Sequence, residues 1–213
     1  MATNDKAAVF DYRALRLLMG IIAFALPIVV SALSTTALSS ISASYHTEGR
    51  DAFVGMLFVV AAFLWAYNGH APAEGRWSKT ASLAAVVVAL FPTACDSCKS
   101  GLVSAIHYIA AVVLFSILAY FCFVYFRQKT KGMPGKKGRR SKIYFACGVI
   151  MVACMLVAAL AALLLPQDAL NASRITYWAE AIALGAFGVA WIVAGKYIPL
   201  LVDQDEALHL FSR

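Results

Sequence analysis

The sequence has few charged residues. Only 14% of its 213 residues are Asp, Glu, Lys or Arg, whereas 62% are hydrophobic. A soluble domain usually has about 25% charged and about 45–50% apolar residues. The composition therefore argues against a soluble protein and favours an integral membrane protein. The length suits one compact all-α bundle over residues 1–213, and not two domains.

The familiar short catalytic motifs are also absent. The chain contains no G-x-x-x-x-G-K-[ST], no G-x-G-x-x-G after a strand, no H-E-x-x-H and no G-x-S-x-G. Nucleotide binding and the common hydrolase mechanisms therefore have no motif support. No barrel-like alternation of apolar and polar residues is visible, so helices must carry the backbone through a membrane.

Long apolar runs are abundant, and six of them predict six transmembrane helices. A spanning helix needs about 20 mostly apolar residues. The first run follows a basic N-terminus and could be a cleaved signal peptide. Its length, and Pro27 in its middle, favour a retained and kinked helix. The expected spans cover approximately residues 15–36, 52–70, 77–95, 101–126, 143–165 and 174–198.

The basic residues are distributed unevenly between the two ends of these spans. If the six spans alternate in direction, 15 of the 18 Lys and Arg residues fall on one side. Only Arg50, Lys99 and Arg174 fall on the other side. Because cytoplasmic loops carry an excess of Lys and Arg, we expect both the N- and the C-terminus in the cytoplasm.

The segment 127–142 holds eight basic residues and no acidic residue, and we expect it to be a cytoplasmic loop. Its Gly132, Pro134, Gly135 and Gly138 favour a flexible segment that is not helical. It could also contact anionic membrane lipids, with about 1 kcal/mol for each basic residue near the surface. No aromatic residues are interleaved and no nucleic-acid-binding fold is present, so we expect no nucleic-acid partner.

Six short sequence segments occur in a recognisable order along almost the whole chain. In this order they resemble a family of uncharacterised bacterial six-span inner-membrane proteins, a domain of unknown function. The resemblance implies the six-helix fold and a location in the bacterial inner (cytoplasmic) membrane, but no reaction. The sequence departs from the family at CDSCK (95–99), where the family has a longer and variable loop. The segments are SISASYHTEGRDAFVG (40–55), FLWAYNGH (63–70), ALFPT (89–93), IHY (106–108), IYFACGVIM (143–151) and YWAEAIALGAFGVAWIVAGK (177–196).

Ionisable residues from four segments are expected at one level, in the outer leaflet. Glu180 would lie about 9 Å inside the sixth span at about 1.5 Å per residue, and His107 at a similar depth in the fourth. Polar side chains within spans are functional candidates by default. The candidate ligand-binding residues are His46, Arg50, Asp51, His107, Tyr177 and Glu180.

Three functions are compatible with this set. The leading one is a polar cavity in the outer leaflet that binds a small or lipid-derived ligand. The second is a metal-dependent hydrolase acting on a lipid, with zinc held by His46, Asp51, His107 and Glu180. The third is a proton- or cation-coupled transporter, although no internal repeat supports it. The sequence leaves open whether the protein is an enzyme.

Several of the candidate residues also have a structural explanation. Asp51 opens the second span, where the helix dipole favours an acidic residue. His107 could bond a neighbouring helix, and Tyr177 sits where an aromatic belt is expected. Glu180 needs a partner because an unpaired carboxylate in lipid is costly, and we expect Arg50 or His107 in that role.

The cysteines divide between loops and spans. Cys95 and Cys98 form CDSC in an outer connection and could be joined by a disulfide. Cys122, Cys147 and Cys154 lie within spans, and we expect them to pack as small apolar residues.

Small residues recur in the last span, around Gly185 and Gly188. Small side chains let helices approach each other closely. They predict a tight bundle and could also support a homo-oligomer. The other partners that the sequence predicts are membrane lipids.

Overall fold

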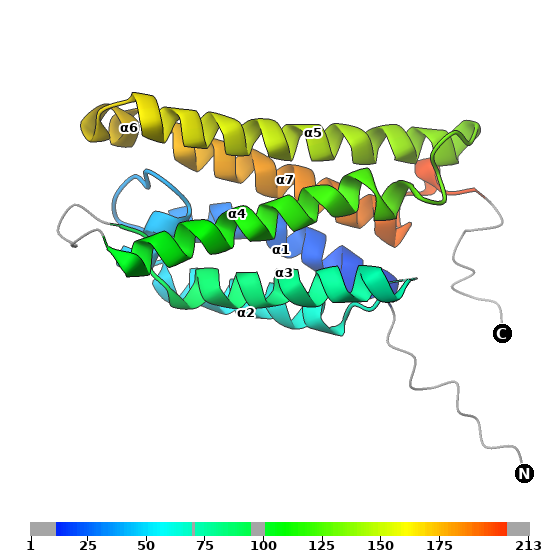
Figure 1. Ribbon diagram of the computed structural model, residues 1–213, viewed down its shortest axis with the longest axis horizontal. Coiled ribbons are helices and arrows are strands. Elements are labelled where there is room, and N and C mark those ends of the chain that lie inside the picture. Colours follow the sequence, from blue (N-terminus) through cyan, green and yellow to red (C-terminus); the bar gives the residue numbers. More distant parts are fainter. Residues whose placement is uncertain (1–11, 70, 95–100, 204–213) are drawn as a thin grey trace, which may run out of the picture.

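The computed structural model is a bundle of long helices. It describes residues 12–69, 71–94 and 101–203, and no strand occurs in these ranges. The expected all-α fold class is confirmed, and each of the six apolar runs forms one long helix (Figure 1). The helices are α1 (Tyr12–Leu33), α2 (Arg50–Ala66), α3 (Pro72–Leu90), α4 (Leu102–Phe123), α5 (Gly135–Leu164), a short α6 (Gln167–Ser173) and α7 (Ile175–Gly195). Short 3-10 turns are η2 (Ser42–His46), η3 (Tyr125–Arg127) and η4 (Pro199–Leu201).

Prolines mark several helix boundaries. Pro72 is the first residue of α3, where its missing N–H has no helical partner to lose. Pro92 follows the end of α3, and Pro166 follows the end of α5. A residue that precedes proline disfavours the helical conformation, so these helices end before it.

Four of the helices are long and apolar enough to cross a membrane, namely α1, α4, α5 and α7. The helix α2 has only 17 residues, and α3 carries Glu74, Arg76 and Lys79 near its start. The sequence predicts six spans. Within the described residues, four helices have the length and composition of a membrane span.

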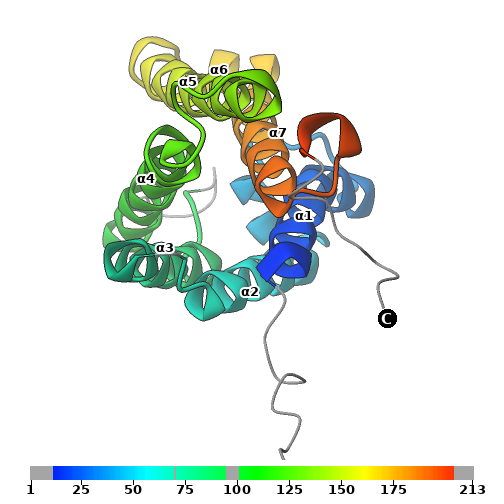
Figure 2. The ribbon, with the colours of Figure 1, turned by 90° about the vertical axis from the view of Figure 1, so that its right-hand side faces the viewer.

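The six long helices form a closed ring, seen along its axis in Figure 2. Each helix packs against two neighbours, in the order α1, α2, α3, α4, α5 and α7. Helices that follow each other in sequence are neighbours, and the contact between α1 and α7 closes the ring.

The closing contact brings two glycines together. A Cβ on Gly20 of α1 would lie 2.9 Å from the carbonyl oxygen of Gly188 in α7. A Cβ on Gly188 would lie 3.0 Å from the carbonyl oxygen of Gly20. The predicted close approach of helices at Gly188 is confirmed. Only the tertiary structure identifies Gly20 as its partner.

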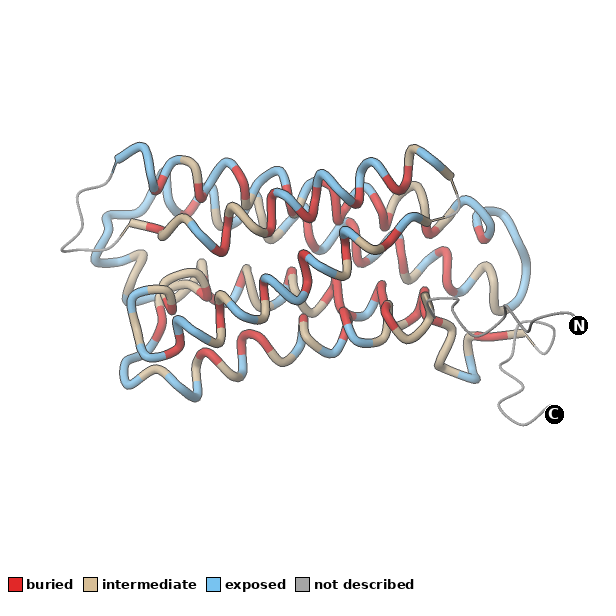
Figure 3. The backbone as a smooth tube through the Cα atoms, turned by 90° about the horizontal axis from the view of Figure 1, so that it is seen from below, coloured by how far each residue is buried: buried red, intermediate tan, exposed pale blue. Residues whose placement is uncertain are grey.

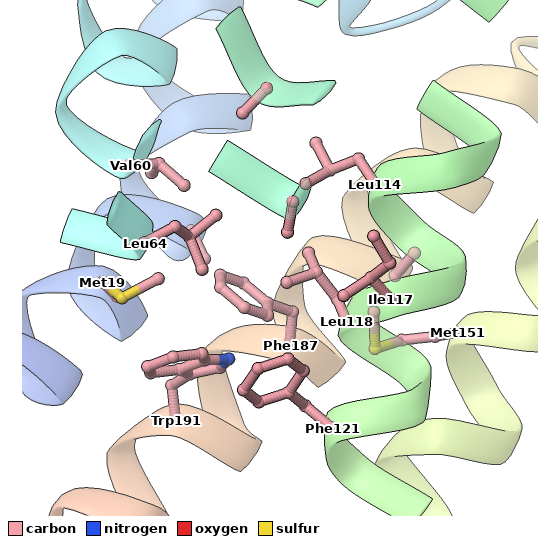
Figure 4. Close-up of a cluster of buried hydrophobic side chains, with 14 of the residues drawn as sticks. Met19, Val60, Leu64, Leu114, Ile117, Leu118, Phe121, Met151, Phe187 and Trp191 are labelled. Carbon is pink, nitrogen blue, oxygen red and sulfur yellow. The ribbon is translucent and has the colours of Figure 1, made fainter. Parts of the chain in front are cut away.

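Large side chains fill the centre of the ring (Figure 4). Trp191 and Phe187 of α7 meet Phe121 of α4, with Leu64 of α2 and Met19 of α1 beside them. The rings of Trp191 and Phe187 lie 5.6 Å apart, and those of Trp191 and Phe121 lie 6.1 Å apart. Such aromatic pairs add to the free energy of burial.

The outward faces of the helices are also apolar. Figure 3 shows exposed positions recurring between buried ones along the length of the bundle. On α5 these include Leu156, Leu160 and Leu163, with exposed fractions of 58%, 53% and 80%. A bundle that is apolar both inside and outside is typical of a membrane protein, because water would penalise so large an apolar surface.

The segment 127–142 differs from its prediction. The sequence predicts a non-helical loop, but α5 begins at Gly135 and includes the last eight residues of this segment. Lys and Arg are good helix formers, and Pro134 immediately precedes the helix. Lys136 donates to the carbonyl oxygens of residues 199 and 202, and Arg140 to that of residue 201. These bonds hold the first turns of α5 against the chain that follows α7.

We predict that Gly20→Ala weakens the α1–α7 contact. Its Cβ would clash with Ile192 Cγ1 as well as with the carbonyl oxygen of Gly188, so one helix must shift. Overpacking of this kind costs about 1–3 kcal/mol. The measurement is thermal unfolding of the purified protein in detergent.

The matched control is Gly55→Ala on α2, where an added Cβ has nothing within 4 Å. This variant should unfold at the temperature of the unsubstituted chain or slightly above it. Equal unfolding temperatures for the two variants would contradict the proposed crossing.

Candidate functional site

The six candidate residues all lie at one end of the ring, which we call the loop end. It contains the connection 34–49 between α1 and α2, the residues that follow α3, and the start of α4. The opposite end carries the segment 127–142 and is called the basic end. Figure 1 shows the loop end at the left and the basic end at the right.

Glu180 binds backbone groups of the connection 34–49. Its Oε2 accepts hydrogen bonds from the N–H groups of Ile41, at 2.5 Å, and Ser42, at 3.4 Å. These groups begin the turn η2, where helical N–H groups lack partners within the helix. A carboxylate is favourable there because of its negative charge. Glu180 is therefore paired with backbone and not with Arg50 or His107, the partners expected from the sequence.

Two neighbours of Glu180 hold the same stretch of chain. The Nε of Arg174 donates to the carbonyl oxygen of Leu38 at 2.9 Å. The backbone N–H of Tyr177 donates to the carbonyl oxygen of Ser39 at 3.0 Å. Together with Glu180, these residues fasten residues 38–42 to the start of α7, and we call them the Glu180 group. The sequence offered only a weak signal for Arg174, as one of three basic residues on its side.

The hydroxyl of Tyr177 extends this attachment into α1. It lies 2.7 Å from the hydroxyl of Ser31 and donates to the carbonyl oxygen of Pro27 at 3.2 Å. Tyr177 is buried, with 7% of its surface exposed. Its hydroxyl therefore has partners inside the bundle, which a buried polar group requires.

The two histidines bind carbonyl groups just after the end of α3. His46 Nε2 lies 2.9 Å from the carbonyl oxygen of Thr93, and His107 Nδ1 lies 2.7 Å from that of Phe91. The carbonyl group of Phe91, the residue that caps α3, lacks a helical partner, and Pro92 prevents the helix from continuing. The histidines supply donors at this point, one from η2 and one from α4.

The hydrogen-bond partners of the histidines determine which ring nitrogen carries a hydrogen. A carbonyl oxygen can only accept, so Nε2 of His46 and Nδ1 of His107 must each carry a hydrogen. In a neutral His46 ring, Nδ1 is then an acceptor. His46 is exposed, whereas His107 has only 1% of its surface exposed. Of the two, only the His46 ring therefore presents itself to solvent.

Three more side chains surround the same point. The hydroxyl of Tyr45 lies 3.5 Å from the carbonyl oxygen of Leu90 and accepts a bond from Arg50 Nη2 at 3.1 Å. The Arg50 guanidinium lies 4.5 Å from the centre of the Tyr45 ring, within the range of a cation–π contact. The hydroxyl of Tyr108 lies 3.2 Å from Oγ1 of Thr93.

The histidines and these side chains form a second set at the loop end. We call it the His46 group, and its members are Tyr45, His46, Arg50, Thr93, His107 and Tyr108.

The connection 34–49 also closes on itself. The hydroxyls of Ser34 and Thr47 lie 2.8 Å apart, and the backbone N–H of Thr35 donates to Glu48 Oε2 at 3.3 Å. Hydrogen bonds from the backbone at Glu48 and at Thr35 hold the pKa of the Glu48 carboxyl below its ordinary value. The connection is thus an ordered loop whose ends lie close together.

The structure therefore divides the candidate residues between two groups. Tyr177 and Glu180 belong to the Glu180 group, while His46, Arg50 and His107 belong to the His46 group. The turn η2 links the two groups. Asp51 lies exposed in the first turn of α2, as its role as a helix start predicts.

The four residues considered as zinc ligands are not brought together. Within residues 12–69, 71–94 and 101–203, no group of three or more His, Cys, Asp or Glu side chains could hold a metal ion. His46, His107 and Glu180 instead bind backbone groups.

The cysteine predictions are tested only in part. The possible disulfide of Cys95 and Cys98 lies outside the described residues. Cys122 and Cys147 are buried and Cys154 is half-buried, as expected for small apolar packing.

The sequence did not predict a series of three hydrogen-bonded side chains at the basic end, those of Arg16, Tyr67 and Glu74. Arg16 Nη1 donates to the carbonyl oxygen of Ala194 at 2.8 Å, and Nη2 bonds the hydroxyl of Tyr67 at 2.5 Å. That hydroxyl donates to Glu74 Oε1 at 2.6 Å. Tyr67 and Glu74 are buried, with 0% and 2% of their surfaces exposed. This series joins α1, α2, α3 and α7 through charge-assisted bonds.

The sequence indicated these three bonded residues only through one acidic residue, Glu74, near the start of a helix. That indication was too weak to identify a site. The tight loop before α3 confirms how closely Glu74 is held. Gly69 has a φ of 65°, and a Cβ there would clash with the Glu74 carboxyl group. Glycine is needed at this position for both its backbone conformation and the space.

Comparisons of the chain with protein-family models, with curated proteins and with solved structures found no match.

We predict that Glu180→Ala releases the connection 34–49 from α7. Loss of a charge-assisted bond worth about 1.5–3 kcal/mol should speed amide exchange at Ile41 and Ser42 by about ten-fold or more. The measurement is hydrogen–deuterium exchange of the full chain in detergent, followed in peptides that cover residues 36–48.

The control for this experiment is Gln167→Ala on the short helix α6, an exposed residue outside both groups. It should leave exchange in the same peptides unchanged. If Glu180→Ala also left exchange at Ile41 and Ser42 unchanged, the attachment described for Glu180 would be refuted.

Proposed function

We propose that this chain is a six-span membrane protein that binds a small or lipid-derived ligand at the exposed surface of the His46 group. In this proposal both termini lie in the cytoplasm, and the loop end faces the outside. The sequence segments that resemble bacterial six-span proteins support a location in a bacterial inner membrane.

Two observations support α2 and α3 as the remaining spans. Both lie in the ring between α1 and α4, which are themselves long and apolar enough to cross a membrane. Both also expose large apolar side chains on their outer faces, which suit contact with lipid. These include Phe58, Val59, Leu83 and Leu90.

The orientation rests on the distribution of positive charge. The basic end carries the eight Lys and Arg residues of segment 127–142, while the loop end carries Arg50 and Arg174. The positive-inside rule then assigns the basic end to the cytoplasm.

Cysteine labelling tests this topology. In a chain whose five native cysteines are replaced, Ala37→Cys, at an exposed position of the connection 34–49, should react with a membrane-impermeant maleimide in intact cells. Asn68→Cys, between α2 and α3, and Lys129→Cys should react only after the cells are opened. Reaction of Asn68→Cys in intact cells would show that α2 does not cross the membrane.

The observation that carries the ligand proposal is a set of exposed polar side chains in one group: His46 and Tyr108 bond Thr93, and Arg50 bonds Tyr45, the neighbour of His46. His46, Arg50 and Tyr108 come from η2, α2 and α4, and all three are exposed. Within the described residues, Arg50 uses one of its five N–H donors, and His46 bonds through Nε2, which leaves Nδ1 for a ligand. A cation, an imidazole and a phenol at a membrane surface suit a ligand with an anionic or hydroxyl-rich head.

The two other functions considered from the sequence receive less support. A metal-dependent hydrolase would need a group of metal ligands, and the described residues offer none. For a proton- or cation-coupled transporter, Glu180 and His107 would have to exchange protons, yet they belong to different groups at the loop end. We therefore propose neither a hydrolase nor a transporter function.

The ligand proposal predicts that His46→Ala combined with Arg50→Gln lowers the retention of a co-purified small molecule or lipid by about ten-fold, since two polar contacts are removed. Native mass spectrometry of the full chain measures this. Gln167→Ala combined with Asn171→Ala, on α6, is the matched control and should retain as much as the unsubstituted chain. Equal retention in both variants would contradict binding at the His46 group.

A further inference from the structure

The basic residues of segment 127–142 have two different roles. Lys136 and Arg140 point toward the chain after α7 and bond its carbonyl oxygens. Arg127, Lys131 and Lys142 instead line a hollow between the end of α4 and the start of α5. We call it the basic hollow. Its volume is about 370 Å³, and no acidic residue occurs in segment 127–142.

The basic hollow is held in shape by internal contacts. Arg127 Nε donates to the hydroxyl of Ser141 at 3.2 Å, and its guanidinium lies 4.8 Å from the centre of the Phe145 ring. Ser141 is buried, with 6% of its surface exposed. Within the described residues, Arg127 donates through Nε and makes no hydrogen bond through its Nη atoms. A fixed guanidinium with donors to spare matches the oxygens of a phosphate group.

A second, apolar hollow lies between the same two helices, nearer the middle of the bundle, and we call it the apolar groove. It is lined by residues that include Tyr120 and Phe123 of α4 and Val152 and Leu156 of α5. Its volume is about 320 Å³. Since α4 and α5 both have the length and composition of membrane spans, this groove lies at the depth of lipid chains.

The two hollows are neighbours along the α4–α5 contact. Phe145 lines the basic hollow, Phe123 lines the apolar groove, and their rings lie 5.6 Å apart. Val152 follows Phe145 by seven residues, about 10 Å along α5 at about 1.5 Å per residue. A cationic hollow at the helix ends, followed by an apolar groove toward the middle, has the polarity of a phospholipid.

We propose that the α4–α5 contact binds one anionic phospholipid, with its phosphate group in the basic hollow and an acyl chain in the apolar groove. Arg127, Lys131 and Lys142 bind the phosphate and the anionic head group. This site lies at the opposite end of the molecule from the His46 group and does not depend on the function proposed there.

The apolar groove is the reason to prefer a lipid over a soluble anion. Inorganic phosphate or glycerol phosphate would use the three cations but leave the groove without a role. Basic hollows between membrane helices commonly hold anionic head groups by the same electrostatic attraction.

The test uses the full chain reconstituted with vesicles of equal parts phosphatidylglycerol and phosphatidylcholine. Native mass spectrometry should find phosphatidylglycerol retained in preference to phosphatidylcholine. Arg127→Gln combined with Lys142→Gln should lower that retention by about ten-fold, since two charge-assisted contacts are removed. If this pair fails to fold, Lys131→Gln combined with Lys142→Gln takes its place.

The matched control is Lys129→Gln combined with Arg139→Gln, two exposed basic residues outside the hollow. It removes the same charge from the same segment and should change retention by less than about two-fold. An equal loss in both pairs would show only diffuse attraction and would overturn the proposal.

Two further measurements separate a lipid from a soluble anion. Ser116→Phe, which would fill the apolar groove, should lower retention of phosphatidylglycerol. Glycerol phosphate, added at the same concentration as the lipid, should not displace it. Unchanged retention in Ser116→Phe, or displacement by glycerol phosphate, would overturn the proposal of a lipid site.

Discussion

The loop end of this protein depends on hydrogen bonds between side chains and the backbone groups at helix ends. A buried N–H or carbonyl group without a partner is costly, and more so where lipid replaces water. Glu180 binds the N–H groups at the start of η2, and the two histidines bind carbonyl groups of the residues just after α3. The candidate residues of the loop end therefore hold the bundle together, whatever else they do.

This structural role limits where a ligand could act. Glu180 and His107 are engaged inside the bundle, whereas His46 and Arg50 bond the surrounding chain while remaining exposed. A position that fixes a side chain and still presents it to solvent is preorganised for binding. The exposed surface of the His46 group is thus a better candidate than a cavity around Glu180.

The two ends of the ring are stabilised in different ways. Both ends use side-chain bonds to backbone, but only the basic end adds a series of three bonded side chains, Arg16, Tyr67 and Glu74, within the described residues. Between them, the close approach of Gly20 and Gly188 brings the first and last long helices into contact. Removing one partner of a buried charged pair is far more costly than removing an exposed one, so the basic end depends strongly on each member.

The sequence by itself determined the fold class and the approximate place of each long helix, although not the start of α5. An apolar run of about 20 residues has the length of a membrane-spanning helix. Prolines such as Pro92 and Pro166 end helices for local steric reasons. The sequence also predicted that Asp51 begins a helix and that Gly188 lies at a close helix contact, because both follow from local rules.

Only the tertiary structure decided which residues meet. Spacing along separate helices gives the depth of a side chain but not its direction, so the predicted meeting of Glu180 with Arg50 or His107 was replaced by bonds to Ile41 and Ser42. The chain Arg16–Tyr67–Glu74 was not predicted, because its members come from segments far apart in sequence. Helix rotation and the path of the connection 34–49 are set by packing of the whole ring, and no local pattern encodes them.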